Sequence, residues 1–220
     1  MAICTNCGEW TEPPILDRDG SIPVTVCPHC HHREPFTQHP LWWIAGSSGS
    51  GKSTLAPLLR RYLPEHMVFE GEAIDFWRFE GELGDYSSLY NQWLKVAHEI
   101  ALNGPPVVFI ATALPEQLDA CTMRSRFSSI AYLGLVCAED AQTHRLLSRP
   151  AWRNSAVPEF IAGACRFTRR LEELGQRDSP TVALHDTTTS TPDASAQDIA
   201  AWVRAHAVFA TRNPAIRYDN

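Results

Sequence analysis

The 220-residue sequence has few lysines, no long apolar run and no apolar segment at its start. Only Lys52 and Lys95 accompany its arginines, and its net charge is −6, so it lacks the broad positive surface of nonspecific DNA and RNA binders. No apolar run approaches the roughly 18 residues that a membrane span needs. Because the first residues do not resemble an export signal, we expect a cytoplasmic protein.

The length and composition indicate one main domain with a small module attached. A globular balance of 44% hydrophobic and 20% charged residues is enough for one ordinary core. We expect three parts, which are a small module over 1–36, a main domain over 37–210 and a C-terminal tail over 211–220.

Four of the seven cysteines form two Cys-x-x-Cys pairs near the start, separated by nineteen residues. This spacing is typical of a structural four-thiolate zinc site, and a cytoplasmic location favours metal over disulfides. We predict a zinc ribbon with a hairpin turning at Asp19-Gly20, in which zinc supplies most of the folding free energy. The predicted zinc ligands are Cys4, Cys7, Cys27 and Cys30.

The predicted ribbon carries little positive charge. Residues 1–40 contain two arginines, no lysine and five acidic residues. Because a phosphate backbone attracts basic surfaces, this composition favours a packing or partner-binding role over nucleic-acid binding.

A glycine- and serine-rich stretch follows the apolar run Leu41–Trp43 and fits the pattern Gly-x4-Gly-Lys-Ser. A helical pattern follows it, which is the expected context of a phosphate-binding loop and not of a flexible linker. Glycine N–H groups turn toward phosphate oxygens, Lys52 reaches the β- and γ-phosphates of ATP, and the Ser53 hydroxyl ligates Mg²⁺. The predicted nucleotide-binding residues here are Gly46, Ser47, Ser48, Gly49, Ser50, Gly51, Lys52, Ser53 and Thr54.

The rest of the chain alternates between strand-like and helix-like segments. The clearest helical periodicity covers 86–103. This alternation predicts an α/β protein with the P-loop NTPase fold, in which helices flank a parallel sheet of about five strands and ligands bind at the carboxyl ends of the strands. The other strand-like runs are 67–72, 107–113, 130–137 and 181–185.

The most apolar of these runs argues against a motor or switch ATPase. Such proteins place an acidic residue directly after a buried strand, whereas this run ends in Ala-Thr-Ala-Leu. Glu139 and Asp140 follow another strand-like run, but acids also favour the first turn of a helix.

From about Trp42 to His206 the chain resembles the small P-loop phosphotransferases, a group that includes gluconate, shikimate and adenylylsulfate kinases, chloramphenicol phosphotransferase and the nucleotide kinases. FEGEAID (69–75) resembles their Asp-Gly-Asp stretch, ATALPE (111–116) resembles the Ser-Ala-Leu of gluconate kinases, and HRLLSRPAWR (144–153) resembles their arginine-bearing lid. Departures from the gluconate-kinase pattern within 149–153 and at Pro115-Glu116 argue against gluconate as the substrate.

The resemblance implies roles for three arginines. Arg145 would lie against the adenine, and Arg149 and Arg153 would close over the transferring phosphate and exclude water. Arg145 and Arg149 are four residues apart and are predicted to share one helix face, which ends before Pro150. An ordinary solvated helix face is the alternative interpretation for both.

Two acids follow the second strand-like run, Glu72 and Asp75. One could accept the acceptor hydroxyl proton while the other orders magnesium, and the sequence leaves the assignment open. Either could instead cap the following segment.

Three further residues are predicted to contact the acceptor. Thr112 follows a strand-like run, and a buried strand threonine is its alternative. Trp77, with Arg78 beside it, belongs to an aromatic cluster that could stack a flat acceptor or pack in the core.

The function that these patterns favour is ATP- and magnesium-dependent phosphorylation of a hydroxyl on a small molecule such as a nucleoside, a sugar acid or an antibiotic-like compound. One alternative is a kinase acting on a polynucleotide end or a modified base. Another is a nucleotide-dependent regulatory module that binds a protein partner through the ribbon.

Overall fold

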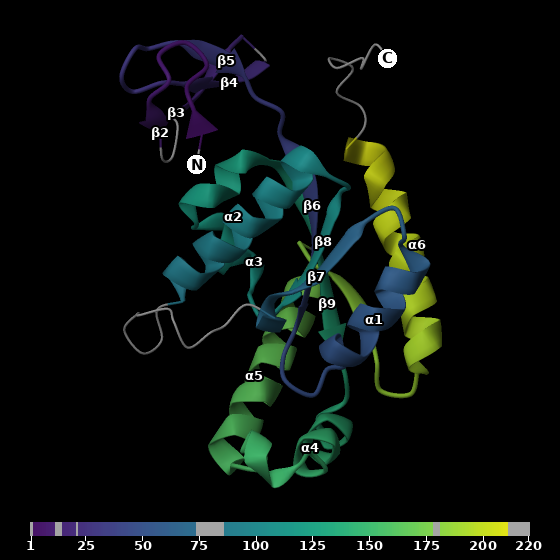
Figure 1. Ribbon diagram of the computed structural model, residues 1–220. Helices are drawn as coiled ribbons and strands as arrows, with labels where there is room; N and C mark the ends of the chain where they lie inside the picture. Colours follow the sequence, from purple (N-terminus) through teal and green to yellow (C-terminus); the bar gives the residue numbers. More distant parts are fainter. Residues whose placement is uncertain (1, 12–14, 21, 74–85, 178–180, 211–220) are drawn as a thin grey trace. The chain divides into compact units, whose positions relative to one another are not determined.

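The computed structural model describes residues 2–11, 15–20, 22–73, 86–177 and 181–210. The chain divides into two compact units, Met1–His39 and Pro40–Asn220, which we describe separately (Figure 1). The domain boundary predicted after residue 36 lies in the short connection between the last strand of the first unit and the first strand of the second. The predicted tail over 211–220 lies outside the described residues.

The first unit is built from short antiparallel strands. β1 (Ala2–Ile3) pairs with β2 (Trp10–Thr11), and a separate three-stranded sheet contains β3 (Ile15–Asp19), β4 (Ile22–Val26) and β5 (Arg33–Pro35). Asp19 pairs with Ile22 across the tight turn that contains Gly20, which has φ 61°. The hairpin predicted at Asp19-Gly20 is therefore confirmed.

A five-stranded parallel sheet forms the centre of the second unit, in the order β10-β9-β6-β8-β7. The predicted α/β fold with about five parallel strands is therefore confirmed. Because the strands are parallel, the segments after β6, β7 and β8 meet at one edge of the sheet. The strands are β6 (His39–Gly46), β7 (Met67–Glu70), β8 (Val107–Ala111), β9 (Phe127–Val136) and β10 (Ala183–Asp186).

Helices cover both faces of this sheet (Figure 1). The longer helices are α1 (Lys52–Tyr62), α2 (Ser87–Asn103), α4 (Glu139–Leu147), α5 (Pro158–Gly175) and α6 (Pro192–Ala210). The short ones are η1 (Gly71–Ala73), α3 (Pro115–Asp119), η3 (Thr122–Arg126) and η4 (Ala151–Arg153). Glu139 and Asp140 form the first turn of α4, where acidic residues are favourable. Within the described residues, no helix combines the length and apolar character that a bilayer crossing requires.

The period-two pattern of β6 divides the core into two apolar clusters. Trp43 is fully buried on the face that α2 and α5 cover, where its ring stacks on Phe109 at 4.8 Å. Trp42 and Ile44 point to the opposite face, where they pack with residues of α1 and α6. Neighbouring strand residues point to opposite faces, so one apolar run supplies both clusters and fixes β6 at the centre.

Two element ends differ from the sequence-based expectation. β7 ends at Glu70 instead of continuing to residue 72, because the chain turns at Gly71 into η1. A Cβ at Gly71 would lie 2.9 Å from Ala111 Cβ, so the turn requires glycine to approach β8. α4 ends at Leu147, because the residue before Pro150 is disfavoured in helical conformation. The prediction that Arg145 and Arg149 share one helix face is therefore wrong.

Candidate functional site

The loop between β6 and α1 has the backbone that its glycines were predicted to allow. Gly49 and Gly51 have φ values of 86° and 101°, in the left-handed region where side chains are strained. Gly51 is also the N-cap of α1, so the loop leads directly into the positive end of the helix. The sequence thus builds an anion-binding turn at the carboxyl end of the central strand.

Lys52 is buried directly behind this loop, with 4% of its surface exposed. Its Nζ donates a hydrogen bond to the Ser47 carbonyl oxygen at 3.0 Å and lies 3.8 Å from Glu72 Oε1. Burial lowers the pKa of Lys52 to about 8, while the nearby charges of Glu72 and Glu70 act in the opposite direction. The lysine is therefore held inside the loop with an ammonium group that is poorly compensated by protein charges.

The hydroxyl of Ser53 donates to Glu70 Oε1 at 2.6 Å. Glu70 is the last residue of β7, and it was not among the predicted site residues. The signal that could have identified it was its place at the end of a parallel strand, where side chains face the site. The pair supplies two oxygen atoms next to the loop, and oxygen ligands are those that Mg²⁺ prefers.

Glu72 lies two residues further along the chain, in η1. Its side chain is 46% exposed, so one edge of the carboxylate faces solvent while Oε1 faces Lys52. The structure thus brings together two of the predicted catalytic residues. The other predicted acid, Asp75, and the predicted acceptor contacts Trp77 and Arg78 lie outside the described residues.

The segment after α4 brings two arginines to the site. Burial lowers the pKa of Arg149, the neighbouring charge of Arg153 lowers it further, and Glu72 opposes both effects. Arg149 also lowers the pKa of Lys52, so it lies within electrostatic reach of the buried ammonium group. Arg153 is exposed and stacks over the ring of Trp152, with its Cζ 5.4 Å from the ring centroid. Arg149, which also lines the cavity described below, therefore adds a second positive charge near Lys52, and this favours an anion there.

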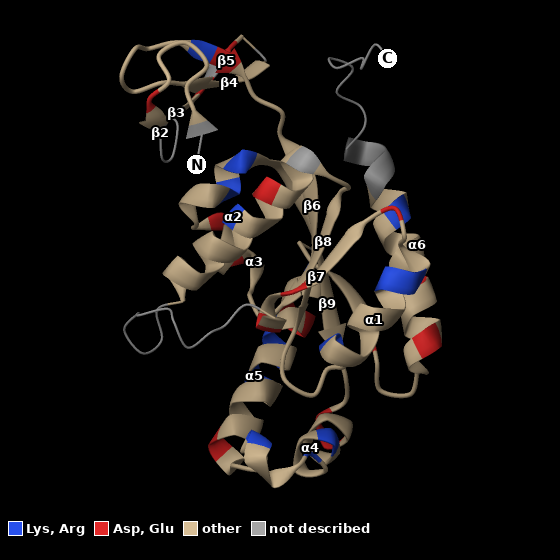
Figure 2. Ribbon diagram, viewed as in Figure 1, with Lys and Arg blue, Asp and Glu red and all other residues tan. Residues whose placement is uncertain are grey.

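Arg145 lies in the last turn of α4. This helix carries both acidic and basic residues (Figure 2). Its guanidinium donates to the carbonyl oxygens of Gly49 at 3.2 Å and Thr187 at 2.6 Å. It is therefore not an ordinary solvated surface arginine, because it ties the loop after β10 to the glycine loop.

A cavity of about 360 Å³ opens beside Arg145. Its wall is formed by the glycine loop, the start of α1, the end of α4 and the segment from β10 into α6. The volume lies within the range of small-molecule sites, and the adjoining loop makes it suitable for the base of a nucleotide. The lining residues are Gly49, Gly51, Thr54, Leu55, Arg145, Arg149, Thr187, Ser190, Pro192 and Ser195.

Thr112, the predicted acceptor contact, directly follows β8 and is half-buried. Its hydroxyl donates to the Gly46 carbonyl oxygen at 2.8 Å. The hydroxyl therefore has a partner within the protein, and a contact with an acceptor stays a prediction.

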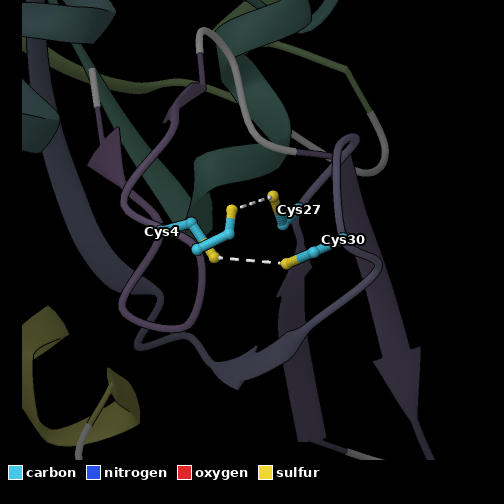
Figure 3. A group of neighbouring side chains, drawn as sticks. Cys4, Cys27 and Cys30 are labelled. Atoms are coloured by element: carbon cyan, nitrogen blue, oxygen red, sulfur yellow. Dashed lines mark hydrogen bonds between the residues drawn. The ribbon is translucent and has the colours of Figure 1, made fainter.

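In the first unit, the four predicted zinc ligands come together (Figure 3). All four sulfur atoms lie within 4.8 Å of one another, with Cys4 Sγ 3.6 Å from Cys30 Sγ and Cys7 Sγ 3.8 Å from Cys27 Sγ. These distances far exceed the roughly 2.05 Å of a disulfide bond. Four sulfurs around a tetrahedral Zn²⁺ at about 2.3 Å would be about 3.8 Å apart, so the cluster has the dimensions of a four-thiolate zinc site.

The two cysteine turns have matching backbones. In the first, Gly8 N donates to the Cys4 carbonyl oxygen, and in the second His31 N donates to that of Cys27, both at 2.9 Å. Gly8 and His31 both have positive φ, at 75° and 59°. Each turn therefore presents its sulfurs through the same backbone geometry, although only one of them has glycine at the position that favours it.

Comparisons with known proteins identify the fold. No family model matches the sequence, and no curated protein matches it. Among solved structures, similar ones include a sugar kinase from Janibacter sp. HTCC2649 (TM-score 0.55, 13% identity, covering 80% of this chain and 100% of that one). Another is the tunicamycin resistance protein of Deinococcus radiodurans (TM-score 0.54, 20% identity, covering 76% of this chain and 96% of that one). A third is the APS kinase of Mycobacterium tuberculosis in complex with AMPPNP and APS (TM-score 0.53, 17% identity, covering 76% of this chain and 98% of that one). The chain therefore has a P-loop kinase-like fold.

Proposed function

We propose that this chain is an ATP- and magnesium-dependent kinase that transfers the γ-phosphate of ATP to a hydroxyl group of a small molecule. The observation that carries this proposal is the grouping of Lys52, Glu72 and Arg149 beside the glycine loop. Phosphoryl transfer needs cations around the phosphate and a carboxylate near the acceptor hydroxyl, and this grouping supplies both.

The glycine loop and the start of α1 would hold the phosphates. The loop N–H groups and the helix dipole favour negative charge, and the buried Lys52 would neutralise the β- and γ-phosphates from inside. The adjoining cavity, with Arg145 in its wall, would take the adenine. Arg149 and Arg153 would stabilise the charge on the transferring group and limit the access of water.

Ser53 and Glu70 are the residues that would hold magnesium. Their oxygen atoms lie 2.6 Å apart at the base of the site, which fits an ion that binds oxygen and keeps several waters. When bound, the ion would supply positive charge that neutralises the phosphate oxygens.

Glu72 is our candidate for the group that accepts the proton of the acceptor hydroxyl. Its carboxylate is partly exposed and faces Lys52, so it can meet an incoming acceptor. Asp75 is the second candidate, as the sequence proposed. Replacing each by the matching amide separates the two, because loss of the base lowers kcat by about 10²–10⁴-fold whereas loss of a cap changes mainly stability.

We also propose that Cys4, Cys7, Cys27 and Cys30 hold a structural zinc ion. Their sulfur distances support this, as does Asn6, whose side-chain N–H donates to Cys30 Sγ at 3.5 Å and helps to orient it. Four thiolates leave no open coordination position, so the ion would stabilise the ribbon and take no part in transfer.

The test is ATP consumption by the purified protein with magnesium and a panel of acceptors, with product mass as the readout. The panel contains nucleosides, nucleotides, sugar acids, aminoglycoside-like compounds and 5′-hydroxyl oligonucleotides. A gain of one phosphate on a small acceptor would establish the proposal. Labelling of oligonucleotides alone would replace it with a polynucleotide kinase, and ATP binding without transfer would indicate a regulatory module.

Lys52→Ala is the control for that assay. It should abolish transfer while the circular dichroism spectrum stays unchanged, because it removes the charge at the phosphates. Lys95→Ala, which alters the only other lysine, should retain full activity. Normal transfer by Lys52→Ala would contradict the proposal.

A further inference from the structure

Each carbonyl oxygen of the glycine loop from residue 46 to residue 50 accepts a hydrogen bond from a side chain. The two outermost donors come from the ends of strands, one comes from α1, and two come from α4. In order, the donors to Gly46, Ser47, Ser48, Gly49 and Ser50 are Thr112 (2.8 Å), Lys52 (3.0 Å), Gln142 (2.8 Å), Arg145 (3.2 Å) and Thr187 (3.1 Å).

These bonds determine where the loop N–H groups point. In a planar trans peptide unit, the carbonyl of one residue and the N–H of the next point in opposite directions. Gln142, Arg145 and Thr187 hold three successive carbonyls, so the peptide N–H groups of residues 49 and 51 point away from these donors. The N–H of Ser50 instead donates to the Ser47 carbonyl oxygen at 3.3 Å and closes the turn. Such a loop is oriented toward an anion before the anion arrives, and binding costs less reorganisation.

Gln142 is itself fixed by a closed ring of buried hydrogen bonds. Its Nε2 donates to Ser47 Oγ at 2.5 Å, and its Oε1 accepts from Thr168 Oγ1 at 3.0 Å. The Ser47 and Thr168 hydroxyls lie 2.9 Å apart and complete the ring. All three residues are at most 3% exposed. A glutamine amide buried this completely is expensive unless every partner is present, so the ring holds it in a single orientation.

We propose that Gln142 is a positioning residue for nucleotide binding, kept in place by Thr168, and that α4 pre-orients the phosphate loop through Gln142 and Arg145. This inference rests on the proposed function, and it assigns roles to Gln142 and Thr168 that no sequence pattern indicated. The chain leaves α4 two residues before Arg149, so the segment that bears Arg149 directly follows the helix that holds the loop.

The experiment measures Kd for Mg-ATP and for pyrophosphate, together with kcat, in the full-length protein. Gln142→Leu keeps the volume and removes the amide, and we expect Kd for both ligands to rise about tenfold through the loss of buried hydrogen bonds. The kcat at saturating ATP should fall less than Kd rises, because the transferring groups remain. Pyrophosphate lacks the base, so an equal effect on both ligands assigns the loss to the phosphate loop.

Thr168→Val and Thr168→Ser form the second pair of variants. The valine variant should raise Kd for both ligands by about threefold, because it leaves Gln142 Oε1 without its donor. The serine variant should restore the wild-type Kd. The matched control is Arg169→Ala, because Arg169 also joins α5 to α4, through an exposed ion pair with Glu139 at 2.6 Å. Removing this surface pair should leave both Kd values unchanged.

A Kd within twofold of wild type in both Gln142→Leu and Thr168→Val would overturn the inference, even if their melting temperatures fall, because the role would then be structural only. If Gln142→Leu does not fold, the Thr168 pair decides by the same criterion. Wild-type protein that binds neither Mg-ATP nor pyrophosphate would overturn the proposed function as well. Normal wild-type binding with unaffected variants would overturn only this inference.

Discussion

The interiors of the two units differ in composition. Among the described residues of the first unit, only Cys4, Val24 and Cys27 are apolar and buried, whereas Ile3 and Trp10 are more than half exposed. The second unit buries an apolar cluster on each face of its sheet. Fewer than forty residues rarely bury enough apolar surface to offset the loss of chain entropy, so we expect the first unit to depend on the proposed zinc ion.

The two units also differ in how their functional side chains relate to their buried residues. In the first, two of the four clustered cysteines, Cys4 and Cys27, are also most of the buried apolar residues. In the second, the buried side chains around the glycine loop are additional to two large apolar clusters. We therefore expect the first unit to lose its structure with its ligand, and the second to lose function before structure.

The largest effect should come from removing metal. Chelation, or Cys30→Ser, should unfold the first unit, because structural zinc contributes roughly 10–16 kcal/mol in small zinc modules. NMR amide signals of the first unit should collapse to random-coil positions while those of the second persist, and a metal assay on untreated protein should find about one zinc. Cys165→Ala, a buried cysteine outside the cluster, should keep that zinc. Metal-free protein with a folded first unit would contradict the prediction that this unit depends on zinc.

The next effect is the loss of a core aromatic in the second unit. Trp43→Ala should lower its unfolding free energy by about 3–5 kcal/mol, because it opens a cavity beside Phe109 and Trp93. Denaturant unfolding followed by circular dichroism measures this, and zinc content should not change. Trp152→Ala, at a site 76% exposed, should stay within about 0.5 kcal/mol of wild type.

A pH-dependent effect should arise in the second unit from Lys52. Burial lowers its pKa to about 8, and bound phosphates should raise it again. Binding above pH 8 must therefore take up a proton, and Kd for ATP should rise by up to about tenfold per pH unit until the pKa of the complex is reached. Calorimetry at pH 9 in buffers of different ionisation enthalpy measures the uptake. Lys52→Met should show none, and a pH-independent Kd between pH 8 and pH 10 would contradict the prediction.

The smallest effects should come from the cysteine turns. Gly8→Ala places a side chain at φ 75° and should weaken zinc binding by about 1 kcal/mol. The cause is backbone strain and not a steric clash, because none of the described atoms lies within 4 Å of the new Cβ. His31→Gly should strengthen it by a similar or smaller amount. Competition with a chromophoric chelator measures both. A change of zinc affinity in the same direction in both variants would contradict the prediction that the two turns are equivalent.

Much of the fold could be predicted from local patterns. The loop motif needs residues that are adjacent in sequence, and the alternation of strands and helices needs only short-range periodicity. The end of β7 at Glu70 could not be read in this way, because it depends on how closely Gly71 approaches Ala111 from β8. For the same reason Glu70 was missed as a partner of Ser53.

The sequence by itself determined which chemical groups the chain carries, namely four paired cysteines, a phosphate-loop motif and the acids and arginines that follow it. Their spacing along the chain is enough because each motif is local. Only the tertiary structure decided which distant groups meet. Gln142 and Thr168 reach Ser47 across 95 and 121 residues. Such contacts depend on the packing of α5 against the sheet and of α4 against α5, which no local pattern encodes.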